Sequence, residues 1–162
     1  MANNNIQQGL EVIGDFIVDQ LRKTLEEQGH RATGQLQDTM KSVVTTSGSG
    51  FDITIYGQDY AKNVEKGVPK GVWVSVDALA QWVQDKGIAS GEREVKNLAF
   101  AIQRTIYDKG TIQFREKKKG FVEVVLDENA KLIFKMVLDL FTKEITLSLT
   151  NTIRKEKQIF QS

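Results

Sequence analysis

The chain has 162 residues, of which 40% are hydrophobic and 27% charged, so the composition predicts a globular domain with a real core. It contains no cysteine, which excludes disulfides, thiolate nucleophiles and cysteine-ligated metal sites. Its 22 basic and 21 acidic residues give a net charge of +1, so no overall positive charge favours nucleic-acid binding. No apolar run reaches the roughly 18 residues that a membrane-spanning helix needs.

Residues 4–28 are predicted to form an amphipathic helix, because apolar residues recur at three- and four-residue steps. Gly29 suits the position after the helix end, where a left-handed conformation costs glycine little. Further apolar residues lie beside the main stripe and widen it, which predicts contacts with more than one neighbour. The stripe consists of Ile6, Leu10, Ile13, Ile17, Leu21 and Leu25, and the residues that widen it are Val12, Phe16 and Val18.

A short helical turn through Leu36 and Met40 is predicted next, followed by a β-hairpin. Residues 42–46 and 51–56 have the β-branched and aromatic content of strands. The segment Ser47-Gly48-Ser49-Gly50 between them has the composition of a hairpin loop. Apolar and polar residues alternate in the second strand, so one face of the sheet should cover a core. The other face, the loop and the strand edges are candidates for contact with another subunit.

Three helices are predicted between residues 60 and 110. The first covers residues 60–66 and is stopped by Gly67. The second covers residues 76–86 after the N-cap Ser75. The third follows Ser90, which is predicted to cap it, and ends at Lys109-Gly110.

The two tryptophans receive different predictions. Trp82 lies on the apolar stripe of the helix over residues 76–86, so we expect it in the core. Trp73 lies in a loop or short strand before that helix. It is either part of the core or an aromatic anchor for a neighbouring subunit.

Residues 111–120 break the helical pattern and are predicted to form a loop that holds the most concentrated basic run of the chain. One interpretation is a solvated loop whose charge serves solubility. The other is a contact with DNA in a channel or with an acidic patch on a partner, because a few cations suffice for salt-dependent phosphate contacts. The residues concerned are Arg115, Lys117, Lys118 and Lys119.

From about Phe121 to Lys155 the sequence predicts a long helix with two apolar lines. A domain of this size cannot readily cover so much apolar surface, so we expect oligomerisation to bury the rest. The first line is Leu126, Ala130, Ile133, Val137, Leu140 and Leu147, and the second is Phe134, Leu138, Phe141, Ile145 and Leu149. Candidate subunit contacts are Ser47, Gly48, Ser49, Gly50, Trp73, Phe134, Leu138, Phe141 and Ile145.

The sequence predicts no catalytic, metal or cofactor site. The single histidine, His30, has no second histidine and no cysteine to complete a metal triad. No G-x-S-x-G turn surrounds a serine, and the glycines of the hairpin loop do not form a phosphate-binding pattern. Carboxylate pairs lie near helix ends or on faces predicted to be exposed. We therefore expect a protein that is not an enzyme and that needs no cofactor.

Two motifs flank the predicted hairpin in an order that resembles a known family. The first is Thr33-Gly34-Gln35-Leu36, and the second runs from Tyr56-Gly57 through Tyr60-Ala61-Lys62-Asn63-Val64-Glu65-Lys66-Gly67. This order resembles the neck and tail-completion proteins of tailed bacteriophages, typified by the tenth gene product of lambdoid phages. The likeness covers roughly residues 5–110, and segments 78–88 and 99–111 are similar to larger members with an extra helical pair.

The resemblance implies an α+β fold in which a small antiparallel sheet, built on the hairpin, packs against several helices, with long helices at both ends of the chain. Residues 1–120 would form the core and residues 121–162 a long C-terminal helix and tail of the same domain. The implied protein is a structural virion subunit of a sixfold or twelvefold ring that joins portal, adaptor and tail proteins around the DNA channel. It would assemble in the bacterial host cytoplasm and contact no membrane. The alternative is a nucleic-acid-associated accessory protein that acts through the basic loop.

Overall fold

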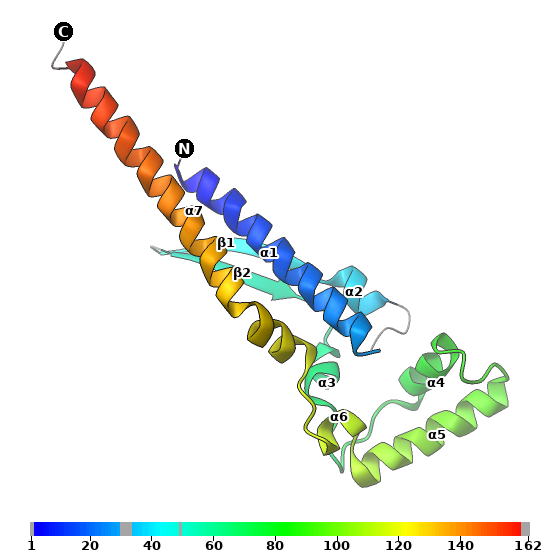
Figure 1. Ribbon diagram of the computed structural model, residues 1–162. Helices are drawn as coiled ribbons and strands as arrows, with labels where there is room; N and C mark the ends of the chain where they lie inside the picture. The colour runs from blue at the N-terminus through cyan, green and yellow to red at the C-terminus, as the bar shows by residue number, and fades with distance from the viewer. Residues whose placement is uncertain (1, 30–33, 49, 160–162) are drawn as a thin grey trace. The chain divides into compact units, whose positions relative to one another are not determined.

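The computed structural model describes residues 2–29, 34–48 and 50–159 (Figure 1). It confirms the α+β class, with a two-stranded antiparallel sheet among helices and with the longest helices at the two ends of the chain. In chain order the elements are α1 (Ala2–Glu27), α2 (Gln35–Thr39), β1 (Lys41–Ser47), β2 (Gly50–Tyr56), α3 (Ala61–Lys66), α4 (Val76–Asp85), α5 (Glu92–Lys109), α6 (Ile112–Arg115) and α7 (Phe121–Ile159).

The chain divides into two compact units. The first unit consists of Met1–Gln20, Lys41–Tyr56 and Leu126–Ser162, and the second of Leu21–Met40 and Gly57–Val125. Two of the boundaries fall inside long helices, so α1 and α7 contribute residues to both units, and the other two fall at the ends of the hairpin. The predicted division at residue 120 within a single domain stays a prediction.

In the first unit, β1 and β2 pair from Lys41↔Tyr56 to Ser47↔Gly50. Along β2, half-buried and exposed residues alternate, as the apolar and polar pattern of the sequence predicts. The half-buried residues are Phe51, Ile53 and Ile55, and the exposed ones are Gly50, Asp52, Thr54 and Tyr56. The hairpin therefore covers the core of this unit with one face.

Helices α1 and α7 pack side by side in the first unit (Figure 1). A side chain at Gly9 would collide with Leu140, so the absence of one lets the two helices approach closely. Near the start of α1, the Asn5 side chain donates to Glu144 Oε2 at 3.4 Å. Since residue 5 meets residue 144 and residue 9 meets residue 140, the two helices run antiparallel. The buried residues of α1 in this unit are Leu10, Ile13, Gly14 and Val18.

In the second unit, Arg22 joins α1 to α2. Its Nε donates to the carbonyl of Gln37 and its Nη2 to the carbonyl of Met40, both at 2.9 Å. These bonds satisfy carbonyls at the end of a helix of only five residues. Leu21, Leu25, Leu36 and Met40 are buried, so the predicted turn after Gly34 is confirmed and belongs to the core.

Helices α4 and α5 form a helical pair whose core centres on Val83, Ala89 and Val95. Ser75 caps α4 as predicted, because its hydroxyl accepts from the N–H of Ala78 at 3.3 Å. The prediction that Ser90 caps α5 is wrong. The N-cap is Gly91, which has no side chain to accept a hydrogen bond.

Three further predictions are corrected. Trp82 is not a core residue: it is 39% exposed, because the buried side of α4 centres on its neighbour Val83, which is fully buried. The segment over residues 111–120 is not only a loop, since it contains α6, whose N-cap Thr111 accepts from the N–H of Phe114 at 3.4 Å. Val12 is 63% exposed and does not widen the buried stripe of α1.

Candidate functional site

Residues of the two sequence motifs meet in the second unit. The Tyr60 hydroxyl forms a hydrogen bond with the backbone of Leu36. Burial raises the pKa of Tyr60 above its ordinary value, and the hydrogen bond with Leu36 opposes part of that rise. Side-chain atoms of Leu36 and Met40 also lie 3.7 Å from the place that a Cβ of Gly57 would take. The motif residues thus hold α2 against the start of α3, whereas Thr33 lies outside the described residues, as does the single histidine.

Gly67 and Gly110 end α3 and α5 in the same uncommon conformation, with φ 72° and ψ 173° at the first and φ 77° and ψ 171° at the second. Almost only glycine occupies this region. The N–H of Thr111 donates to the Val68 carbonyl, and the N–H of Val68 donates to Thr111 Oγ1, both at 2.9 Å. We call Gly67, Val68, Gly110 and Thr111 the glycine crossing. It joins two segments that are 43 residues apart in sequence.

Glu65 holds the first turn of α7. Its Oε2 accepts from the N–H of Val122 at 2.8 Å and its Oε1 from the N–H of Glu123 at 3.2 Å. A carboxylate in this place satisfies donors that lack partners inside the helix and faces the positive end of the helix dipole. Glu65 is therefore a capping residue. Sequence reasoning missed this role because the cap lies 57 residues before the helix that it serves.

The predicted basic residues all lie in α6 and the turn that follows it. Lys117 has a φ of 48°, which is uncommon for a residue other than glycine. The Gln113 side chain donates to the carbonyls of Lys118 at 3.0 Å and Lys119 at 3.3 Å, and so holds this turn together. The Gln28 side chain donates to the Lys119 carbonyl as well, at 3.4 Å.

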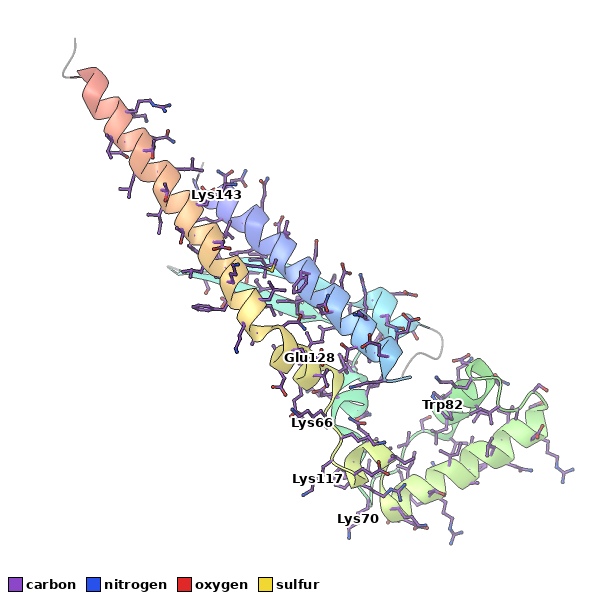
Figure 2. All side chains as sticks on the ribbon, in the orientation of Figure 1. Lys66, Lys70, Trp82, Lys117, Glu128 and Lys143 are labelled. Carbon is purple, nitrogen blue, oxygen red and sulfur yellow. The ribbon has the colours of Figure 1, made fainter. Side chains whose placement is uncertain are left out.

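The surface around this turn carries both signs of charge. Lys66, Arg115, Lys117 and Lys118 line one shallow depression together with Glu65 and Glu123, and Figure 2 shows Lys66 and Lys117 there. Lys118 Nζ lies 2.9 Å from Glu116 Oε2. That hydrogen bond, with the charge of Lys118, holds the pKa of Glu116 below its ordinary value. The sequence did not indicate that Lys66 of α3 would lie beside the basic run. Nor did it indicate that the acids Glu65 and Glu123 would lie there.

Trp73 lies on the surface of the second unit and is 61% exposed. Its ring stacks on Tyr107 of α5 with the centroids 4.2 Å apart. Hydrogen bonds hold the loop on both sides of it: the N–H of Gly71 donates to the Tyr107 carbonyl, and the Gln103 side chain donates to the Val74 carbonyl, both at 2.7 Å. The structure thus excludes Trp73 from the core and leaves its role as a subunit anchor a prediction. Nothing in the sequence indicated Tyr107 as its partner.

The hairpin tip is exposed at Ser47, Gly48 and Gly50, while Ser49 lies outside the described residues. The Ser47 hydroxyl donates to Asp52 Oδ2 at 2.6 Å, which ties the end of β1 to β2. Contact between this tip and another subunit stays a prediction.

The two predicted apolar lines of α7 differ in exposure within the first unit. In the first line Ile133, Val137 and Leu140 are half-buried, but Leu126, Ala130 and Leu147 are exposed, so that line is covered only in its middle. In the second line Phe134 is 69% exposed, Leu138 53%, Ile145 58% and Leu149 58%, and Phe141 is half-buried. We call this second line the outer face of α7: Phe134, Leu138, Phe141, Ile145 and Leu149.

Among the described residues, no three or more His, Asp or Glu side chains form a group that could hold a metal ion. In the same ranges, no helix combines the length and the apolar character needed to cross a membrane. Comparison with protein-family models, with curated proteins and with solved structures gives no match for this chain.

Proposed function

We propose that this chain is a structural subunit that assembles with further copies of itself. We further propose that the assembly is a sixfold or twelvefold ring in the neck of a tailed bacteriophage, where it joins portal and tail proteins around the DNA channel. The observation that carries the self-assembly is the outer face of α7. The order of the sequence motifs supports the place in the virion.

The outer face of α7 is too apolar for a surface that only meets water. Its residues recur at steps of three and four, so they share one side of the helix. The charged residues interspersed with them, Lys135, Asp139 and Lys143, fall on other sides. Full burial of a Phe, Leu or Ile side chain stabilises by roughly 1.5–3 kcal/mol. A partner that covers several such side chains would therefore gain a substantial free energy of association.

The contacts of the motif residues support a structural role over a chemical one. Glu65 caps a helix, Gly67 forms the glycine crossing, and Tyr60 bonds to a backbone group. These three residues therefore contact other elements of the second unit, and these contacts favour a role in holding the unit together.

The first prediction is that Phe134→Ser weakens self-association about tenfold, which corresponds to about 1.4 kcal/mol. Because Phe134 is 69% exposed, the folded subunit should keep its stability. Analytical ultracentrifugation over a range of concentrations measures the association, and circular dichroism follows thermal unfolding. The matched control is Phe100→Ser, which removes a ring that is 57% exposed on α5 in the second unit.

A wild-type chain that remained monomeric at every concentration, alone and with purified portal or tail proteins, would contradict the proposed function. Cryo-electron microscopy of the assembled species would count the subunits, and a number other than six or twelve would contradict the proposed symmetry.

A second candidate function is contact with DNA through the basic turn, which the added cation Lys66 favours. We predict that Arg115→Gln combined with Lys117→Gln reduces the magnitude of the slope of log affinity against log salt concentration by about 2. Fluorescence anisotropy with a labelled DNA duplex measures the affinity between low and physiological salt. The control is Arg93→Gln with Arg104→Gln, which removes two exposed cations from α5. Failure of the wild-type chain to bind DNA at low ionic strength would eliminate this candidate.

A further inference from the structure

Eight apolar residues along α7 have the same spacing when counted from either end of the series. They comprise the outer face, two residues before it and one residue after it. From the first to the last, the steps between them are 4, 4, 4, 3, 4, 4 and 4 residues. We call this series the palindromic line: Leu126, Ala130, Phe134, Leu138, Phe141, Ile145, Leu149 and Ile153.

The palindromic line leaves room for a further helix beside α7. Every member of the line is exposed except Phe141, which is half-buried. Lys135 and Thr142, which lie beside the line, are exposed as well. The residues that contact α1, Leu140 and Glu144, lie on another side of the helix. The contacts within the first unit therefore leave most of the line uncovered.

A second copy of α7 that runs in the opposite direction matches this spacing. When the midpoint between Leu138 and Phe141 is aligned in the two copies, every apolar residue of the line lies level with an apolar residue of the other copy. Side chains in such layers can interdigitate, as they do between the helices of a coiled coil. The level pairs are Leu138 with Phe141, Phe134 with Ile145, Ala130 with Leu149, and Leu126 with Ile153.

Charge favours the antiparallel orientation over a parallel one. Lys131 is exposed beside the palindromic line. A parallel pair would bring it level with the same lysine of the second copy, and like charges repel. In the antiparallel pair Lys131 lies level with Ser148, which is exposed and uncharged. Antiparallel helices also bring opposite ends of their dipoles together.

We infer that the palindromic line of one copy packs against the same line of a second copy, with the two α7 helices antiparallel. This inference rests on the proposed self-assembly and adds the surface, the orientation and the register. Both copies use the same surface, so the contact is complete with two copies. The pair is then the unit from which the proposed ring is built, and a different surface must join one pair to the next.

Disulfide crosslinking tests the register, because the chain contains no cysteine of its own. One variant carries Phe134→Cys and another carries Ile145→Cys. Mixed and oxidised with copper phenanthroline, they should give a covalent dimer on a non-reducing gel. Each variant alone should give about ten times less, because its two cysteines would lie about 16 Å apart along the helix axes and a disulfide needs Cα atoms within about 7 Å.

A second mixture guards against weakened association. Ala130→Cys and Leu149→Cys also lie level in the inferred pair, and they leave both phenyl rings of the line in place. This mixture should crosslink too.

The matched control is a mixture of Leu132→Cys and Leu147→Cys. These residues are 47% and 46% exposed and would also lie level with each other in the inferred pair. Each is two residues from Phe134 or Ile145, which turns its side chain about 200° around the helix and away from the second copy. The control mixture should therefore crosslink no more than either of its members alone.

Three outcomes would overturn the inferred pair. In the first, a single variant crosslinks as strongly as its mixture, as a parallel pair requires. In the second, the control mixture crosslinks as strongly as the test mixtures. In the third, neither test mixture crosslinks. The proposed self-assembly would survive each of these outcomes if the wild-type chain still associates in the ultracentrifuge. A wild-type chain that never self-associates would remove both proposals.

Discussion

Replacing Gly67 by alanine should lower the free energy of unfolding by about 3 kcal/mol or more. At φ 72° and ψ 173° any residue but glycine is strained, at a cost of roughly 1–3 kcal/mol. The added Cβ would also lie 2.5 Å from the backbone nitrogen of Phe114 and 2.5 Å from Thr111 Oγ1. Both atoms belong to α6 or its cap, so neither can move without disturbing the glycine crossing. Urea unfolding followed by circular dichroism measures the loss.

Gly71→Ala separates the two parts of this effect. Gly71 has a φ of 83°, but a Cβ there meets nothing within 4 Å. Its substitution should therefore cost only the conformational strain, about 1 kcal/mol. Equal losses at Gly67 and Gly71 would show that the close approach at the crossing contributes nothing.

Removal of the Glu65 carboxylate is expected to have the second largest effect on stability. Glu65→Ala should lower the free energy of unfolding by about 2 kcal/mol, because it leaves the N–H groups of Val122 and Glu123 without their acceptor and removes a charge that favours the helix dipole. Glu65→Gln keeps one acceptor oxygen and should cost about half as much. Urea unfolding gives the total, and hydrogen exchange should show faster exchange at residues 122 and 123.

The matched control is Glu123→Ala. Glu123 is an exposed acid in the same first turn of α7, so its loss removes a dipole contact and leaves the cap in place. We expect a cost of only about 0.5 kcal/mol. If Glu123→Ala were as costly as Glu65→Ala, charge near the helix end would explain the effect and the specific cap would not.

The local elements of this fold could be predicted because their signals are local. The apolar steps between Leu10 and Leu25 set the helical period of α1, Ser75 caps the helix that follows it, and the alternation in β2 identifies its buried face. Each of these signals comes from residues within a few positions of one another. The error at Ser90 concerns a helix end, where a neighbouring residue can take the capping role. Helix α6 was missed because its four residues are too few to show a helical period.

The long-range contacts could not be predicted from the same patterns. The sequence places Glu65 only in a motif on a short helix, and the fold alone brings it to a helix that begins 56 residues later. Trp82 and Val83 are adjacent apolar residues on one predicted stripe. Packing between α4 and α5 buries Val83 fully and leaves Trp82 39% exposed.

For this protein, the sequence by itself determined the fold class, the order and approximate ends of the helices and strands other than α6, and the excess of apolar surface on the last helix. Periodicity, caps and turn residues act over a few positions, so one chain carries that information without reference to its folded state. Only the tertiary structure decided that Gly67 meets Thr111, that Glu65 caps α7, and that one apolar line of α7 is covered in its middle while most of the outer face stays exposed. Those outcomes depend on which distant segments come within contact distance, and local spacing does not encode that proximity.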